Sequence, residues 1–307
     1  MVAVMTSSGR QRCRDPIISV VTIVRNAAAD LRHTLPHVFS QSMDAFEVIV
    51  LDGGSTDDTV DVIRSFEPQI DHWESGADGG PFHAMQKAAT VARGRWILFM
   101  NAGDRFVDAD ALGRLHDAAR DDADFVAGHH IYVDAEGLES LHECADFEHT
   151  YARLLAGDLD SAWVRGTPCH QAVLTRTDLL RRHGFDLSYR IAADHEFMYR
   201  MRRQGASFQV VPTVVAEYVA GGLSSRQELH CLEEWRRMAH AYSQDVRRAD
   251  HNIDRLVTMA LKAIRRRGPF DFSQESIRRH RLRATIIDLR YRLKQLVGLS
   301  RRPPRNS

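Results

Sequence analysis

The chain has 307 residues, of which 44% are hydrophobic and 27% are charged, a composition that is typical of globular proteins and excludes a disordered chain. Its formal net charge is zero, and we expect no nucleic-acid partner. The charge is unevenly placed, because residues 250–307 contain 15 Lys or Arg against 5 Asp or Glu. This basic tail predicts contact with an anionic partner, such as a membrane surface or another chain, with solvated helix faces as the alternative.

The sequence gives no sign of export or of a membrane span. The arginines near the N-terminus are not followed by an apolar segment, so no secretory signal is predicted. No apolar run approaches the roughly 20 residues that a transmembrane helix needs. The four cysteines are far apart and lack metal-ligand spacing. We therefore expect a cytoplasmic protein, or one held peripherally on the inner face of the cell membrane.

The first third of the chain alternates β-branched strands with amphipathic helices. After a flexible leader over residues 1–15, strands are predicted at 17–24, 46–51, 70–73 and 96–100. Helices are predicted between them at 27–41, 58–66 and 82–92. Pro36 is expected to kink or end the first helix. This order predicts βαβ units, right-handed crossovers and a Rossmann-like α/β fold with a mostly parallel sheet.

The pattern changes beyond residue 105. Short strands are predicted at 125–128, 131–133, 172–174, 210–211 and 214–218. Helices are predicted at 177–183 and from about residue 194, followed by a flexible Gly-Ser loop at 221–225. The remaining residues, 226–307, are predicted to form a basic helical C-terminal extension with helices at 226–244, 253–267 and 274–297.

Three strand-to-helix connections of the predicted sheet carry an acid. Asp52 ends the second strand, Asp78 follows the third, and Asp104 follows the fourth. Ligands of open α/β sheets bind at the carboxyl ends of the strands, so we expect the three acids at one such edge. The glycines at 53–54 would let another group approach the backbone closely. Ser55 and Asp58 have the spacing of a capping box for the next helix, while a simple turn at Asp52 is the alternative.

Four blocks of residues, taken in order, resemble one family. They are Ser19-Val20-Val21-Thr22-Ile23-Val24-Arg25-Asn26, then Leu51-Asp52-Gly53-Gly54-Ser55-Thr56-Asp57-Asp58-Thr59, then Gly94-Arg95-Trp96-Ile97-Leu98-Phe99-Met100-Asn101-Ala102-Gly103-Asp104, and finally His170-Gln171-Ala172-Val173 with Tyr189-Arg190-Ile191-Ala192-Ala193-Asp194-His195-Glu196. Together they are similar to inverting family 2 glycosyltransferases of the GT-A fold, of the type that builds bacterial cell-envelope polysaccharides and glycolipids. The resemblance implies a GT-A domain at 16–225, with a nucleotide-binding half at 16–105 and an acceptor half at 106–225.

The resemblance also implies roles for individual residues. Asp52 would hydrogen-bond the donor's base, in a pocket lined by Thr22 and Val24 with Asp78 on its other side. Asp104 would contact the donor diphosphate through Mg²⁺ or Mn²⁺, and Asp194 would be the catalytic base. His170 could help to hold the diphosphate, and Ser224 lies in the loop that could close over it.

The chemistry explains why acids are needed at these places. A divalent cation held by carboxylate oxygens neutralises the leaving diphosphate, and the acceptor hydroxyl needs a base on the opposite face of the sugar. The sequence departs from the family pattern where Asn101 and Gly103 leave Asp104 as the one acid of the metal motif. His83 and Gln86 also stand where Asp and Asn are usual, which bears on the choice of sugar.

The sequence thus predicts a metal-dependent glycosyltransferase of the hexosyltransferase type. The donor is expected to be UDP- or dTDP-linked, and the acceptor to be a glycan or lipid-linked saccharide. The basic residues at 265–267 follow an amphipathic stretch and could rest on anionic lipid. One alternative is a non-catalytic partner subunit that binds a nucleotide sugar. A sugar nucleotidyltransferase is a further alternative, although no Gly-rich loop with a basic residue follows the first strand.

Overall fold

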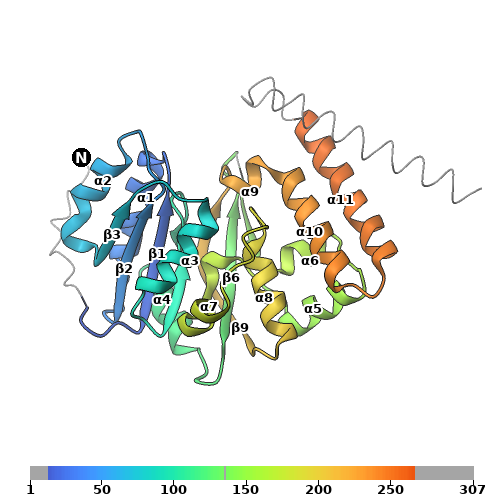
Figure 1. Ribbon diagram of the computed structural model, residues 1–307, viewed down its shortest axis with the longest axis horizontal. Coiled ribbons are helices and arrows are strands. Elements are labelled where there is room, and N and C mark those ends of the chain that lie inside the picture. Colours follow the sequence, from blue (N-terminus) through green and yellow to red (C-terminus); the bar gives the residue numbers. More distant parts are fainter. Residues whose placement is uncertain (1–12, 135, 267–307) are drawn as a thin grey trace, which may run out of the picture. The chain divides into compact units, whose positions relative to one another are not determined.

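A computed structural model describes residues 13–134 and 136–266 (Figure 1). The chain divides after Leu256 into two compact units, and the first of these holds every strand of the described residues. Residues 1–12 of the predicted leader and the predicted helix at 274–297 lie outside the described residues. Among the helices of the described ranges, we find none with the length and apolar character required to cross a membrane.

One mixed nine-stranded sheet forms the centre of the first unit. Its strands run in the order β3-β2-β1-β4-β8-β6-β9-β5, with β7 paired to β6. Their bounds are Ile18–Val24 (β1), Phe46–Asp52 (β2), His72–Ser75 (β3), Trp96–Phe99 (β4), Arg105–Phe106 (β5), Phe125–Val133 (β6), Glu139–His142 (β7), Val173–Arg176 (β8) and Phe208–Val219 (β9). The first four strands in this order are parallel, so their carboxyl ends meet at one edge, whereas β8 is antiparallel to both neighbours.

Helices cover both faces of the parallel part. The α-helices are Ala28–Phe39 (α1), Thr59–Phe66 (α2), Pro81–Val91 (α3), Ala111–Asp117 (α4), Phe147–Leu155 (α5), Ser161–Gly166 (α6), Thr177–His183 (α7), Ala193–Arg203 (α8), Leu223–Arg226 (α9), Glu228–Tyr242 (α10) and Val246–Arg266 (α11). Leu31 and Leu35 of α1 share a core cluster with Val20 and Val48 of the sheet, while α3 contacts β1 and β2. Every residue of β2 is buried, as expected for a parallel strand covered on both faces.

Two predicted pairs of short strands are continuous strands in the structure. β6 and β9 pair in parallel, but their register shifts where Ala127 pairs with Val210 and His129 pairs with Val214. The additional residues of β9 include Pro212, which lacks the N–H that a regular ladder requires. Gly128 lies at the same irregularity, where an added Cβ would come within 2.6 Å of the Thr213 carbonyl oxygen. The irregular pairing therefore explains why the sequence predicts two short strands in place of each of β6 and β9.

Several predicted boundaries were wrong. Helix α1 continues through Pro36 to Phe39, and β3 starts at His72, after a 3-10 turn at Glu67–Gln69. The predicted loop at 221–225 contains the start of the short helix α9. The short elements β5, β7, α4, α5 and α6, which all lie beyond residue 104, were not predicted.

Candidate active site

Asp52 at the end of β2 and Asp78 after β3 belong to one corner of the site. We call Thr22, Val24, Asp52 and Asp78 the Asp52 corner. Asp52 is 4% exposed and its carboxyl oxygens accept hydrogen bonds from the Ser55 hydroxyl, from the Ser55 amide at 3.0 Å and from the Ser75 hydroxyl at 2.6 Å. The predicted capping box is therefore wrong, because Ser55 binds Asp52 and helix α2 begins later, at Thr59.

Two glycines allow the connection after β3 to lie against the connection after β2. A Cβ at position 53 would come within 3.0 Å of an Asp78 carboxyl oxygen. Gly54 has φ +76°, and a Cβ there would come within 3.0 Å of the Ala77 amide nitrogen. Only glycine adopts this conformation without strain at so close an approach. The group that lies close to the two glycines is therefore the 76–78 segment. This packing brings Asp78 beside the end of β2.

Strand β1 places two further side chains at this corner. Val24 pairs with Asp52 in the parallel register, so the two side chains lie on the same face, and Thr22 shares that face two residues earlier. Val24 is 5% exposed and Thr22 is fully buried. The Thr22 hydroxyl has no hydrogen-bond partner within the described part of the chain. A buried hydroxyl without a partner is costly, and a bound ligand could satisfy it.

A second group of side chains lies at the end of β4, next to β1. We call Asn101, Asp104, His170, Gln171 and Asp194 the Asp194 centre. The Met100 amide donates to the Val21 carbonyl at 2.8 Å, so the 101–104 segment starts beside Thr22. The structure therefore brings the ends of β1, β2 and β4 to one edge, with Asp52 and Asp104 both at that edge, as the sequence predicted.

Asp104 is enclosed by its own partners. It is 5% exposed, and its oxygens accept from the Gln171 amide at 2.6 Å and from the Val219 backbone N–H at 3.0 Å. Burial raises the pKa of this carboxyl group to about 6, although these two hydrogen bonds oppose the rise. The Ser224 hydroxyl lies 2.6 Å from the Tyr218 hydroxyl, and this contact does not join it to Asp104.

These contacts bear on the expected metal site. Both oxygens of Asp104 are occupied by protein donors, and residues 101 and 103 of the motif carry no charge. Over residues 13–134 and 136–266, no cluster of three or more His, Cys, Asp or Glu side chains could hold a metal ion. The residues present therefore fit a cation at Asp104 poorly.

A chain of hydrogen bonds links Asn101, His170 and Asp194. His170 Nδ1 lies 2.7 Å from Asp194 Oδ2, and His170 Nε2 lies 2.8 Å from the Asn101 amide nitrogen. An ionised carboxylate only accepts, so Nδ1 carries the proton, and Nε2 then accepts from Asn101. The side-chain Oδ1 of Asn101 is buried and without a partner among the described residues. His170, which the resemblance suggests could help to hold the diphosphate, contacts Asp194 and Asn101 through its two ring nitrogens.

Asp194 is a buried, ionised carboxylate. It is the second residue of helix α8, and its other oxygen accepts the His195 backbone N–H at 2.9 Å. Burial would raise the pKa of Asp194, but the electrostatic effect of His195 and the hydrogen bond from His170 outweigh it and lower the pKa to about 2. Asp194 is therefore an anion throughout the neutral range and can accept a proton.

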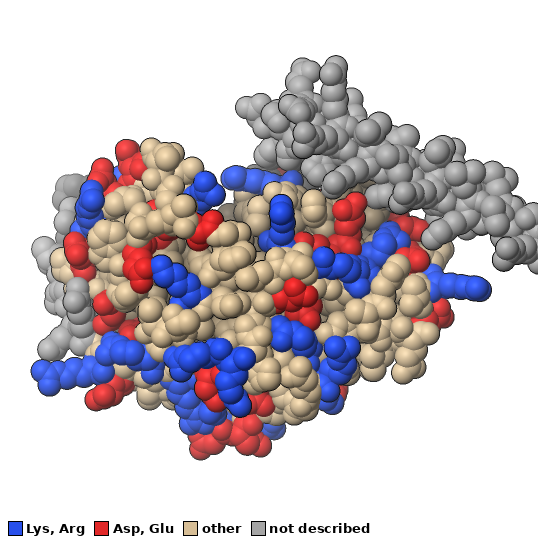
Figure 2. All heavy atoms as spheres, in the orientation of Figure 1, with Lys and Arg blue, Asp and Glu red and all other residues tan. Residues whose placement is uncertain are grey.

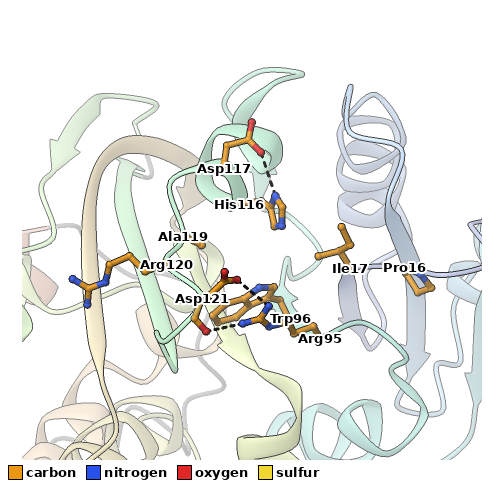
Figure 3. Close-up of a pocket in the computed structure, with 9 residues that line it drawn as sticks. All are labelled: Pro16, Ile17, Arg95, Trp96, His116, Asp117, Ala119, Arg120 and Asp121. Carbon is orange, nitrogen blue, oxygen red and sulfur yellow. Dashed lines mark hydrogen bonds and ion pairs between the residues drawn. The ribbon is translucent and has the colours of Figure 1, made fainter.

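The structure also has a cavity of about 650 Å³ that lies elsewhere (Figure 3). Its lining includes Ile17, which directly precedes β1, and Arg95, which precedes β4. These residues are at the amino ends of the parallel strands, whereas Asp52 and Asp104 are at the carboxyl ends. Over the described residues on the face drawn in Figure 2, acidic and basic side chains are interspersed. Neither feature identifies a second candidate site.

Comparisons with known proteins support one assignment. The model of the family "Glycosyl transferase family 2" matches residues 19–181. A PGL/p-HBAD biosynthesis glycosyltransferase of Mycobacterium tuberculosis is 32% identical over 216 residues, which cover 68% of this chain and 80% of that protein.

The fold is also shared with solved structures. TarS of S. aureus in complex with UDP has a TM-score of 0.54 at 16% identity, covering 77% of this chain and 69% of that one. The mannosyltransferase PcManGT of Pyrobaculum calidifontis, in complex with GDP-Man and Mn²⁺, has a TM-score of 0.56 at 17% identity, covering 83% and 76%. These neighbours confirm the GT-A fold. The chain belongs to glycosyl transferase family 2.

Proposed function

We propose that this glycosyltransferase moves a sugar from a nucleotide-diphosphate donor to a hydroxyl acceptor with inversion, and that Asp194 is the catalytic base. The observation that carries the proposal is the Asn101–His170–Asp194 chain of hydrogen bonds at the edge where β1, β2 and β4 end. This chain keeps a carboxylate ionised and oriented beside the connections that would bind the donor. In the same proposal Thr22, Val24, Asp52 and Asp78 form the nucleotide pocket.

The reaction is a single displacement. The acceptor oxygen forms a bond to the anomeric carbon as the bond to the diphosphate breaks, and the electron pair leaves with the diphosphate. The acceptor proton passes to Asp194. Because its partners hold the pKa of Asp194 below its ordinary value, the carboxylate is ionised and can accept this proton. Asp194 thus acts through its position rather than through high basicity.

The cofactor and the substrates follow from the relatives and remain part of the proposal. Mg²⁺ or Mn²⁺ would help to neutralise the diphosphate, as the Mn²⁺ in the PcManGT complex suggests. Asp104 would offer the cation a single buried carboxyl group that already accepts from Gln171 and Val219, so we assign no step to the cation. Neighbours bound to UDP, UDP-GlcNAc and GDP-Man support a nucleotide-sugar donor, with UDP or dTDP as our preference. The relative in PGL/p-HBAD biosynthesis supports a cell-envelope acceptor.

The test is the substitution Asp194→Asn. UDP-, dTDP- and GDP-sugars are first screened with the wild-type protein for release of free nucleotide, with Mn²⁺ and with EDTA. Asp194→Asn should lower the turnover of the best donor by about 10³-fold or more, while calorimetry shows unchanged UDP binding. Asp178→Asn, which removes an exposed acid from α7, is the matched control. Normal turnover in Asp194→Asn would refute the assignment of the base, and UDP binding without any turnover would favour a non-catalytic partner subunit.

A further inference from the structure

Helix α8 carries Asp194 but lacks a cap of its own. Its N-cap residue is Ala192, whose side chain cannot accept a hydrogen bond from the first turn. The first backbone N–H groups of a helix have no partner within the helix, and if buried they must be satisfied from outside. The backbone that leads into the helix is buried as well, with Ile191 8% and Ala192 1% exposed, so its N–H groups need acceptors from the protein.

An acceptor for this leading segment comes from helix α10, which lies within the predicted C-terminal extension at 226–307. Glu234 is 7% exposed, and its carboxyl group accepts three consecutive backbone N–H groups from the segment before Asp194. The distances are 2.6 Å from Arg190, 2.9 Å from Ile191 and 2.8 Å from Ala192. Three donors on one buried side chain fix both the position and the direction of this backbone.

Other side chains of α10 contact the same region. The Trp235 ring lies 5.8 Å from the His195 ring, and the Tyr242 hydroxyl donates to Glu196 at 3.3 Å. The Arg237 guanidinium lies 3.5 Å from the centre of the Tyr189 ring. Helix α10 therefore contacts the start of α8 through several side chains, while His170 holds the carboxyl group of Asp194 itself.

We infer that Glu234 is a positioning residue of the transfer reaction, which sets where helix α8 begins and so where Asp194 stands. The inference rests on the proposed function of Asp194. His170 orients the carboxyl group, and Glu234 places the backbone that carries it. A catalytic group displaced by about 1 Å can lose about 10²-fold in rate, because the reacting atoms must meet in a narrow range of geometries. The catalytic domain accordingly includes α10 and does not end at residue 225.

The experiment compares Glu234→Gln with Glu233→Gln in the full chain. A glutamine at position 234 keeps one acceptor oxygen, but its amide nitrogen faces a backbone N–H, which breaks the triple contact. Glu233 is the neighbouring half-buried acid on the same helix, so its variant removes the same charge without that contact. Glu234→Asp keeps both oxygens on a shorter arm and should have an intermediate effect.

Two readouts decide the outcome. Glu234→Gln should lower kcat about 10²-fold with the donor KM near the wild-type value, and Glu233→Gln should change neither. Hydrogen exchange of residues 190–196 should become faster in Glu234→Gln alone, with the melting transition still cooperative. Unchanged exchange and unchanged kcat in a folded Glu234→Gln protein would overturn the inference. A fully active Asp194→Asn would refute the proposed role of Asp194 and not the structural role of Glu234. Hydrogen exchange separates the two failures, because it reports on the backbone at 190–196 without requiring turnover.

Discussion

The Asp52 corner and the Asp194 centre hold their acids in different ways. Asp52 takes its hydrogen bonds from two hydroxyl groups and one amide, supplied by Ser55 in the connection after β2 and by Ser75 at the end of β3. Asp194 takes one from a histidine that is itself held by Asn101, and its backbone segment is held by Glu234 of α10. Hydroxyl groups can rotate to meet a ligand, whereas the second arrangement is fixed by groups with defined directions. The first suits binding and the second suits a reaction.

Breaking the histidine link should have the largest effect. In His170→Ala, Asp194 loses a donor that lowers its pKa, while the burial that raises the pKa remains. The pKa of Asp194 should rise, so the acid limb of the pH–rate profile should move to higher pH. Loss of both orientation and ionisation should lower kcat about 10²- to 10³-fold. The check is the pH dependence of donor turnover.

The matched variants for this prediction are His149→Ala and His170→Asn. His149 is exposed on α5, so its loss should leave the profile unchanged. Asparagine at position 170 can place an amide N–H near the position of Nδ1 and should recover part of the rate. A His170→Ala profile with the wild-type acid limb would show that His170 does not act on Asp194.

The next largest effect concerns the buried carboxyl group of Asp104. Its pKa is raised to about 6 in the folded protein against 3.8 for the ordinary group, so the folded state binds more protons between these values. This contribution to stability is present at low pH and is lost as the pH rises through 6. At about 1.4 kcal/mol per pKa unit, the loss is about 3 kcal/mol as an order of magnitude.

Asp104→Asn should remove this pH dependence. The Gln171 amide can turn its oxygen toward the new side chain, so the variant should still fold. The free energies of unfolding of the wild type and of Asp104→Asn are measured with urea between pH 4 and about 7. The wild-type value minus the variant value should fall as the pH rises. Asp44→Asn, at an exposed position, is the control. A flat difference would mean that the Asp104 pKa is not raised.

The Asp52 corner could be predicted from sequence because it depends on local pattern and simple topology. A β-branched strand that ends in an acid and two glycines places Asp52 at a strand end, and the βαβ order aligns it with Asp104. The glycine requirement was also predictable, since Gly54 indeed has a positive φ. What the pattern could not show is that Ser55 binds Asp52 and does not cap α2, because both uses have the same spacing.

Of the Asp194 centre, the sequence predicted Asp104, His170 and Asp194 as site residues, but not Asn101 or Gln171 and not the arrangement. Asp194 and His170 came from the family resemblance, and their hydrogen bond depends on how β8, β4 and α8 pack. Glu234 could not be singled out, because a buried acid on an amphipathic helix looks like any other surface acid in the sequence. Nothing in the sequence pattern marks residues 190–192 as a segment whose backbone N–H groups take their acceptor from α10.

The smallest effect is expected for Asp52→Asn, and it sharpens the contrast between the two regions. The Ser55 and Ser75 hydroxyls can turn to accept hydrogen bonds from the new amide, so the fold should tolerate the change. The loss is a charged acceptor for an N–H group of the base, which should weaken UDP binding about tenfold, or about 1.4 kcal/mol, in calorimetry. At saturating donor, kcat should stay near the wild-type value, opposite to Asp194→Asn. Asp61→Asn, an exposed acid on α2, controls for the change of charge. If Asp52→Asn instead lowered kcat with UDP affinity unchanged, the division of the site into a binding corner and a reaction centre would be wrong.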